Sequence, residues 1–598
     1  MYICYQNSKL VMKEFFKYTL ATVVGIIIVS LIFGILGVGS IVGMLASEES
    51  TKTVDDNSVF ILPLSGSLQE RSSEDIFSEF LGVTDNKLGL EDILSAIKKA
   101  KNNDKIKGIY IEAGMFDGGE PATLQTLRKA LVDFRKSGKW IISYADTYTQ
   151  GTYYVCSAAN KVYLNPVGVI DWHGLSSQPY FLKDMLAKFG VKVQLAKVGA
   201  YKSAPEMLTA DKMSDANREQ VSDMINGIWS QICEDVSASR HISVKDLNDY
   251  ADRLITFAPQ EDYLKYKMVD GLVYTDSIKS IIKTMLKVDK KDDIKQLSLA
   301  DMANVKDKNI KGDEVAVYYA YGDVVDTTPD EMSDNYIAAD KMCKELQNLA
   351  DDDEVKAVVI RVNSGGGSAY ASEQIWHSVT KLKAKKPVVI SMGGMAASGA
   401  YYLSAPANWI VAEPTTLTGS IGIFGLFPDF SGLLTDKLGI KFDEVKTNKN
   451  SSFGTLARPF TEEEMSYLNS YINRGYQLFR NRVAEGRHKS VNEIEKIAQG
   501  HVWLGKAALS NGLVDQLGTI DDAVLKAAKL AKIKEYHTYS YPAKTDFLTQ
   551  LFENKKHNYI DDHLHATLGE YYKPFMFLKS IDKQDAMQAR MMFNVNMK

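Results

Sequence analysis

Residues 386–425 read KPVVISMGGMAASGAYYLSAPANWIVAEPTTLTGSIGIFG, and this stretch decides the fold. The apolar run 388–391 is typical of a buried strand, and the small residues after it predict a tight turn into a helix. A serine at such a turn, Ser398, can expose its hydroxyl because small neighbours let a substrate carbonyl approach. The amide of Gly399 would then face a developing oxyanion. A close-packed helix start without chemistry fits the same pattern, so a base must come from elsewhere in the chain.

The overall composition is that of a globular protein. The chain has 598 residues, more than one ordinary core holds, so two or more domains are expected. A net charge of -5 gives no basic surface for nucleic acid. The four cysteines are far apart, and the nine histidines show no metal-binding spacing. We therefore expect no disulfide framework, no metal, no cofactor and no nucleic-acid partner.

Residues 18–46 form an uncharged apolar segment that exceeds the roughly 20 residues needed to span a bilayer. Three lysines precede the segment and two glutamates follow it, so the positive-inside rule places residues 1–17 in the cytoplasm. A cleaved signal peptide is the alternative, but its apolar core would be only about 7 to 15 residues long. The sequence predicts a retained single-pass anchor in the inner membrane, with a water-soluble body on the periplasmic or extracytoplasmic side.

Two copies of one domain follow the predicted anchor. Residues 153–166, YYVCSAANKVYLNP, align without a gap with residues 401–414, YYLSAPANWIVAEP, at an offset of 248. Flanking stretches align at an offset of 249, namely 105–113 with 354–362 and 188–198 with 437–447. An offset that stays almost constant over about 100 residues indicates tandem duplication. We place the first copy at 58–310 and the second at 311–545.

Each copy alternates apolar strands with amphipathic helices, which predicts crossover connections and a mostly parallel sheet. The fold class is therefore α/β, with tandem domains. Strands are predicted at 59–64, 109–112, 140–144, 162–164, 315–319, 357–362, 388–391 and 409–412, and helices at 90–101, 122–137, 211–239 and 461–485. The tail, residues 546–598, lies outside the repeat and is rich in methionine and aromatic residues. Its sequence leaves open whether it docks or forms a partly ordered end.

The two copies differ at the positions that matter for chemistry. Ser398 aligns with Gln150, so the first copy lacks the candidate nucleophile. Lys202, in the sequence YKSA, aligns with Ser451, so the second copy lacks that lysine. A serine and lysine pair is a known variant of nucleophile plus base, and burial lowers the pKa of a lysine. We expect the copies to unite Lys202 and Ser398 in one site, the alternative for Lys202 being an exposed loop lysine.

A glycine-rich loop, residues 361–368 with the sequence RVNSGGGS, follows a predicted strand. Successive glycines let backbone amides turn toward a ligand. A phosphate site is the rival interpretation, but the P-loop pattern with its lysine is absent. An oxyanion hole made by the amides of Gly367 and Gly399 fits better. The matching loop of the first copy carries Asp117 and Glu120, whose charges would oppose an oxyanion.

Taken together, the anchor, the tandem copies, YKSA, RVNSGGGS and MAASGAYYLS resemble the long form of the bacterial signal peptide peptidase A (protease IV) family. The resemblance covers nearly the whole chain. It implies ClpP/crotonase-like domains of repeated ββα units and a serine endopeptidase with a serine-lysine dyad. It also implies a bowl-shaped homotetramer, and cleaved signal peptides and unfolded or misfolded secreted polypeptides as substrates.

The resemblance implies a role for each site residue: Ser398 as nucleophile, Lys202 as general base, Ser420 in TGSIG as the residue that orients the lysine amine, and Gly367 and Gly399 as oxyanion donors. By its sequence alone, Ser420 is more typical of a turn or cap. The chain departs from the family at Gly365, where proline is usual, and this leaves open whether Gly366 or Gly367 supplies the amide.

Two other functions remain as alternatives at this point. An acyl-CoA-processing crotonase-like enzyme would share the oxyanion loops, but it would need no serine nucleophile and normally no membrane anchor. A non-catalytic membrane scaffold built from decayed repeats would need neither Ser398 nor Lys202. Substitution or labelling of Ser398 separates these alternatives from a peptidase.

Overall fold

The computed structural model describes residues 17–19, 22, 24–26, 29–30, 51–72, 87–306, 311–328, 335–544 and 587–591. Most of the predicted anchor at 18–46 and most of the tail at 546–598 lie outside these residues. Among the residues that are described, no helix is both long and apolar enough to cross a bilayer. The membrane anchor therefore stays a prediction.

The first copy is built on a parallel sheet with the strand order β2-β1-β3-β4-β5-β7, and β8 pairs with β1. The strands are β1 (Ser58–Gln69), β2 (Lys87–Gly89), β3 (Ile106–Asp117), β4 (Trp140–Tyr148), β5 (Lys161–Ile170), β7 (Gly271–Leu272) and β8 (Gln296–Leu297). Successive side chains along these strands point to opposite faces. Helices α3 (Leu90–Asn102) and α4 (Pro121–Arg135) cover one face, and α11 (Thr275–Leu286) covers the other.

The second copy repeats this plan, since its order β9-β12-β14-β15-β19 matches β1-β3-β4-β5-β7. The strands are β9 (Asp313–Tyr321), β12 (Val355–Ser364), β14 (Val388–Ala397), β15 (Trp409–Ala412), β16 (Leu417–Gly419), β18 (Val502–Leu504), β19 (Gln516–Leu517) and β20 (Tyr536–Tyr541). Helices α13 (Ala339–Asp351) and α14 (Ala369–Lys385) pack on one face, and α19 (Ile520–Ala531) packs on the other. The predicted tandem α/β organisation is confirmed, while its boundaries at 58–310 and 311–545 stay predictions.

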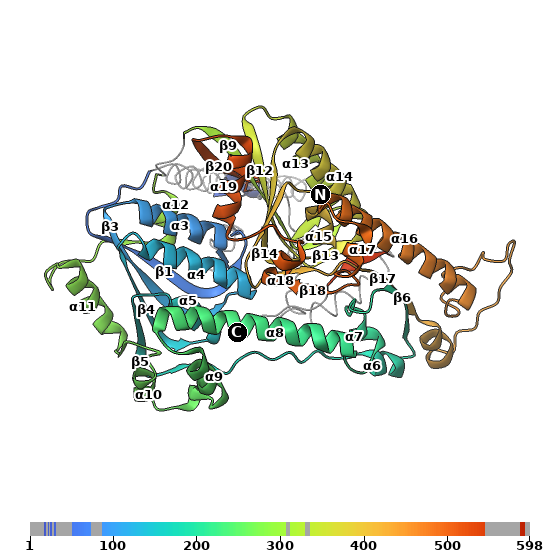
Figure 1. The fold of residues 1–598 in the computed structure, drawn as a ribbon, viewed down its shortest axis with the longest axis horizontal. Coiled ribbons are helices and arrows are strands. Elements are labelled where there is room, and N and C mark those ends of the chain that lie inside the picture. Colours follow the sequence, from blue (N-terminus) through green and yellow to red (C-terminus); the bar gives the residue numbers. More distant parts are fainter. Residues whose placement is uncertain are drawn as a thin grey trace, which may run out of the picture.

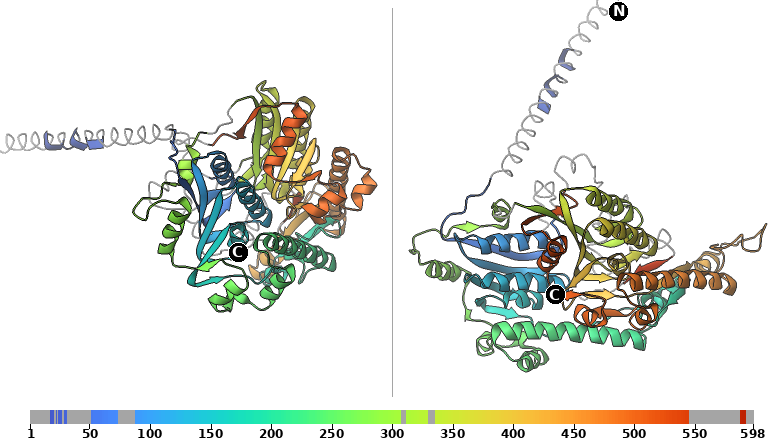
Figure 2. Two further views of the ribbon diagram at one scale, coloured as in Figure 1. Left: turned by 60° about the vertical axis from the view of Figure 1, so that its left-hand side comes forward. Right: turned by 45° about the horizontal axis from the view of Figure 1, so that its top comes forward.

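Residues 171–214 of the first copy extend across to the second copy and pack against it, and we call this segment the crossing arm. The arm contains α6 (Lys183–Lys188), β6 (Lys192–Val198) and α7 (Glu206–Thr209). Strand β6 pairs antiparallel with β17 (Ile423–Asp429) over its whole length. Helix α8 (Asp215–Arg240) then leads the chain back, and its 26 residues span about 39 Å at 1.5 Å per residue. Figure 1 and the right-hand view of Figure 2 show α8 running along both halves of the molecule.

A third sheet therefore combines strands from both copies and from the tail. Its order is β11-β10-β13-β21-β17-β6. The additional strands are β10 (Asp323–Val325), β11 (Tyr336–Ala338), β13 (Gly366–Ser368) and β21 (Gln588–Arg590). Because β6 ends four residues before Lys202, this sheet positions the lysine of the first copy against the second.

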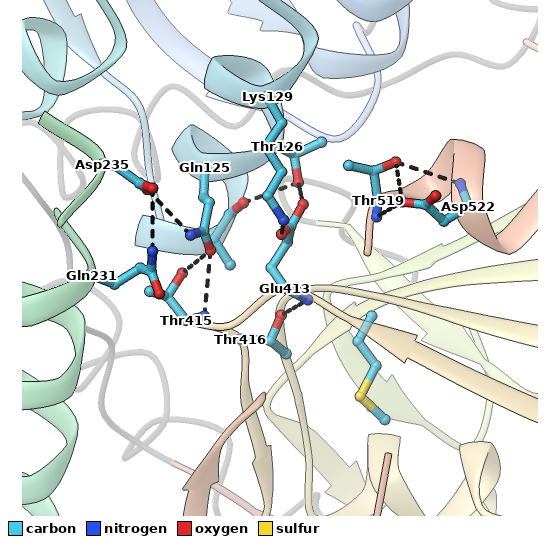
Figure 3. Close-up of polar contacts among 12 residues, drawn as sticks. Gln125, Thr126, Lys129, Gln231, Asp235, Glu413, Thr415, Thr416, Thr519 and Asp522 are labelled. Atoms are coloured by element: carbon cyan, nitrogen blue, oxygen red, sulfur yellow. Dashed lines mark hydrogen bonds and ion pairs between the residues drawn. The ribbon is translucent and has the colours of Figure 1, made fainter. Parts of the chain in front are cut away.

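Buried polar contacts also join the copies, and Figure 3 shows those between α4 and the loop after β15. The Glu413 carboxylate accepts a hydrogen bond from Thr126 Oγ1 at 3.1 Å and pairs with Lys129. Gln125 Oε1 accepts from Thr415 Oγ1 at 2.9 Å. Burial raises the pKa of Glu413, and the lysine beside it opposes that effect. A carboxylate this deeply buried is tolerated because Lys129 and Thr126 each donate to one of its oxygens.

A second buried pair lies between the end of β1 and β12. The Arg361 guanidinium donates to both carboxylate oxygens of Glu70, with Nε at 3.0 Å and Nη2 at 3.1 Å. Arg361 Nη1 also donates to Ser391 Oγ and to the carbonyl of Met392. Both members of the pair are buried. This bidentate contact fixes the first copy against the strand that leads into the glycine-rich loop.

Candidate active site

Ser398 lies at a sharp turn between β14 and α15 (Gly399–Ser404). The sequence predicts that the turn begins with the glycines and alanines after residue 391, but β14 continues through Ala397 and the chain reverses only at Ser398. Ser398 has φ 57° and ψ -115°, which is strained for a residue with a side chain. Its amide donates to the carbonyl of Gly419 at 2.8 Å, and its carbonyl accepts from the amide of Tyr402 at 2.8 Å. These bonds hold the strained turn.

The structure brings Ser398, Lys202 and Ser420 together within one chain. Lys202 Nζ lies 2.6 Å from Ser398 Oγ and 3.0 Å from Ser420 Oγ. The amine also donates to the Ser420 carbonyl at 3.2 Å. The three residues are between 0 and 2% exposed. The hydroxyl of one copy therefore contacts the amine of the other in a site without access to bulk water.

Burial lowers the pKa of Lys202 from 10.5 to about 7, and desolvation is the cause. A lysine paired with a carboxylate would instead hold its proton. With a pKa near 7, about half of the molecules carry a neutral amine at neutral pH, against roughly 1 in 3000 for an ordinary lysine. The amine can thus accept a proton from a neighbouring hydroxyl at physiological pH.

Two glycines and an aromatic ring enclose the side chain of Lys202. A Cβ added at Gly500 would lie 2.6 Å from Cα of Lys202, and one added at Gly422 would lie 3.1 Å from its Cδ. The ring centroid of Phe424 is 6.0 Å from Nζ. The sequence does not point to these three positions, because residues remote from Lys202 in the chain carry no local sign of close approach to it. Only the fold shows that they make room for the buried lysine.

The geometry of the glycine-rich loop favours Gly367 over Gly366 as the donor to an oxyanion. The Gly366 amide already donates to Ser364 Oγ at 3.0 Å. A Cβ added at Gly399 would lie 3.1 Å from the amide nitrogen of Gly367 and 2.6 Å from Ser372 Oγ. The backbones at 367 and 399 are therefore close neighbours. Gly399 opens α15, where helix amides have no intrahelical acceptor.

Gln150, which aligns with Ser398, and Ser451, which aligns with Lys202, make only local hydrogen bonds. The Gln150 side chain is buried; its Oε1 accepts from the amides of His173 and Gly174, and its Nε2 donates to the Gly174 carbonyl. Ser451 is exposed and bonds to the carbonyl of Asn448. Neither position shares a site with a candidate nucleophile or base. Within the described ranges, no group of three or more His, Cys, Asp or Glu side chains could hold a metal ion.

Two α/β domains in tandem, with a serine and a buried lysine where they meet, define the structural class. Residues 133–289 and 380–534 match peptidase family S49, and residues 329–410 match the Clp protease family. Protease 4 of Salmonella typhi is 35% identical over 536 residues, which cover 87% of this chain and 85% of that protein. The chain belongs to peptidase family S49.

Two further relatives match most of the chain. Protease 4 of Haemophilus influenzae is 34% identical over 528 residues, covering 83% of each chain. The chloroplastic serine protease SPPA of Arabidopsis thaliana is 29% identical over 452 residues, covering 75% of this chain and 66% of that protein. At 75% or more of this chain, each of these matches is long enough to include parts of both copies.

Proposed function

We propose that this chain is a serine endopeptidase in which Ser398 is the nucleophile and Lys202 the general base. The 2.6 Å separation between the hydroxyl and an amine whose pKa is about 7 is the observation that carries the proposal. A lysine base must be neutral to take the hydroxyl proton, and desolvation supplies that condition. Membership of a peptidase family supports the same reaction class.

Acyl transfer proceeds in two steps. The neutral amine of Lys202 takes the proton of Ser398 Oγ as that oxygen attacks the peptide carbonyl, and the amides of Gly367 and Gly399 stabilise the oxyanion. Lys202 then gives the proton to the leaving amine, which leaves an ester on Ser398. Lys202 next takes a proton from water, which attacks the ester, and then returns that proton to Ser398 Oγ as the second product leaves. Ser420 Oγ, 3.0 Å from Nζ, orients the amine throughout.

The substrates that we propose are cleaved signal peptides and unfolded secreted polypeptides. The site side chains are at most 2% exposed, and such enclosure favours an extended polypeptide over a folded protein as substrate. We further propose that residues 18–46 anchor the chain in the inner membrane, with the catalytic body on the periplasmic or extracytoplasmic side. Such an anchor would keep the site close to the membrane in which signal peptides remain after cleavage.

We also propose that the chain assembles with further copies of itself. Residues 437–447 of the second copy align with the part of the arm that forms β6, yet they form no strand and are exposed. The contrast is largest at one aligned pair: Ala196 is fully buried against the second copy, whereas Val445 is fully exposed. Residues 174–181, which align with β17, likewise form no strand.

If residues 437–447 of one chain pair with residues 174–181 of the next, the contact made inside the chain by β6 and β17 repeats between chains. Such a head-to-tail contact closes into a ring when the rotation that relates one chain to the next is a whole-number fraction of a full turn. The homotetramer implied by the family resemblance is one such ring. A Val445→Asp substitution should shift the mass in solution, measured by light scattering, from the oligomer toward the single chain. An unchanged mass would reject this interface.

Cleavage of casein and of a leader peptide by single variants tests the catalytic proposal. Ser398→Ala and Lys202→Ala should each abolish cleavage. Ser451→Ala should cleave as the unaltered chain does, because this exposed residue takes the aligned position of Lys202 outside the site. Wild-type turnover by Ser398→Ala would favour crotonase-like chemistry. Failure of a serine-reactive acylating probe to label Ser398 in the native protein would favour a scaffold.

A further inference from the structure

The tail contributes one strand directly to the candidate site. Strand β21 lies between β13 and β17 in the mixed sheet and is antiparallel to both. Its partners are the glycine-rich loop strand on one side and the strand that binds the crossing arm on the other. Such strand addition is how extended peptides commonly bind a sheet edge, with the backbone supplying affinity. Residues 587–591, which we call the tail strand, thus lie where a substrate backbone would lie.

The register of the tail strand places one of its carbonyl groups at the candidate oxyanion donors. Ala589 is opposite Gly367. A Cβ added at Gly366 would lie 2.1 Å from the carbonyl oxygen of Ala589, and one added at Gly399 would lie 3.1 Å from it. The Ala589 carbonyl is therefore next to both segments whose amides would hold an oxyanion. In the proposed mechanism, the carbonyl of the cleaved peptide bond would occupy this position.

Contacts on both sides hold the tail strand in this register. The amide of Met591 donates to the Gly365 carbonyl at 2.8 Å, and the Met587 carbonyl accepts from the amide of Ala369 at 3.1 Å. Arg590 forms an ion pair with Asp323, with Nη2 at 3.2 Å from Oδ2.

The side chains of the tail strand are enclosed as well. Met591 is buried in a cluster with Met224, Met395 and Val502, and it lines the small pocket beside Lys202. Met587 Sδ lies 2.2 Å from where a Cβ at Gly475 would be, so α16 (Glu462–Gly486) approaches it closely. Ala589 is fully buried. A segment enclosed in this way excludes any other peptide from the same slot.

We propose that residues 587–591 occupy the peptide-binding slot of this chain as a substrate-like strand and compete in cis with peptide substrates. This inference rests on the proposed peptidase function and adds the regulation of its site. A substrate binds only to the fraction of molecules from which the tail strand has left, so its apparent dissociation constant is the intrinsic value divided by that fraction. Release of the tail strand is then a step that precedes substrate binding.

The test measures peptide binding in the full-length Ser398→Ala chain, whose tail cannot be removed by serine attack. The probe is a fluorescein-labelled peptide with the sequence of residues 586–592, AMQARMM, and the readout is fluorescence anisotropy. Adding Met591→Asp places a carboxylate in the apolar cluster and should release the tail strand, which strengthens probe binding tenfold or more. Met115→Asp is the matched control, since Met115 is 75% exposed in the first copy, and it should leave the affinity unchanged.

A second variant releases the tail strand by a different substitution, so that the test does not depend on correct folding of Met591→Asp alone. Ala589→Trp adds a large side chain at a fully buried position and should also strengthen probe binding tenfold or more. If neither variant binds the probe more tightly than the Ser398→Ala parent while both keep its melting temperature, competition by the tail strand is rejected. That failure is distinct from failure of the peptidase proposal, which would appear as retained cleavage by Ser398→Ala and does not affect probe binding.

Discussion

The pH dependence of cleavage is the most direct test of Lys202 as the base. Burial lowers the pKa of Lys202 to about 7, so the catalytically competent neutral amine is lost as the pH falls through 7. The neutral fraction is about 0.9 at pH 8 and about 0.01 at pH 5. We therefore expect kcat/KM to fall about 100-fold between pH 8 and pH 5, with a slope near one decade per pH unit below 6 and a plateau above 8.

The assay is hydrolysis of a fluorogenic peptide at constant ionic strength, with the melting temperature recorded at each pH to exclude unfolding. Lys183→Ala is a suitable control, because this lysine lies in the same crossing arm and pairs with Asp211 at the surface. Its profile should match that of the unaltered chain. A rate that is equal at pH 5 and pH 8, or one that still rises tenfold per pH unit above pH 9, would refute a desolvated lysine base.

Three further predictions concern single side chains. Ser420→Ala removes one hydrogen bond to the Lys202 amine, worth about 1 kcal/mol, and should lower kcat roughly fivefold. It should also lower the apparent pKa of the profile, as steady-state kinetics across pH will show. Glu70→Ala leaves the buried Arg361 guanidinium without its counter-ion and should lower the free energy of unfolding by about 3 to 5 kcal/mol, measured by denaturant titration; Glu70→Gln, which keeps an acceptor, should cost less, and equal losses would contradict the ion-pair argument. Ser398→Gly should melt at a higher temperature than Ser398→Ala, because glycine relieves roughly 1 kcal/mol of strain at φ 57°; the reverse order would show that the turn is not strained.

The sequence is sufficient to predict the four central strands of each α/β sheet, because these strands are apolar runs between amphipathic helices. It is also sufficient to predict the pairing of Lys202 with Ser398, since the two copies have lost complementary residues. The course of β14 is less predictable. Its second half, GGMAA, has low strand propensity, yet every residue of the strand is buried between neighbouring strands and helices. Tertiary packing therefore overrides local preference, as it often does in central strands.

Long-range pairing accounts for what the sequence does not reveal. Nothing in the residues of β6 indicates that this strand pairs with β17 of the same chain rather than with another molecule. The tail strand is harder to predict than β6, because the sequence Gln-Ala-Arg has no apolar alternation. It forms β21 only because β13 and β17 leave a slot between them. Gly500 is a third case, because its close approach to Lys202 depends on two loops far apart in sequence.

Division of the candidate site between two copies has a physical rationale in the requirements of a lysine base. The amine must be shielded from water so that its pKa is lowered. It cannot be paired with a carboxylate, because a nearby anion would raise that pKa again and keep the amine protonated. A single sheet edge is open to water, whereas the crossing arm laid along β17 covers Lys202 with backbone and apolar side chains from both copies. Any event that detaches β6 from β17 would rehydrate the amine. At pH 7 the neutral fraction would then fall from about one half to roughly 1 in 3000, so under the proposed mechanism detachment of the arm should lower kcat/KM about 1000-fold.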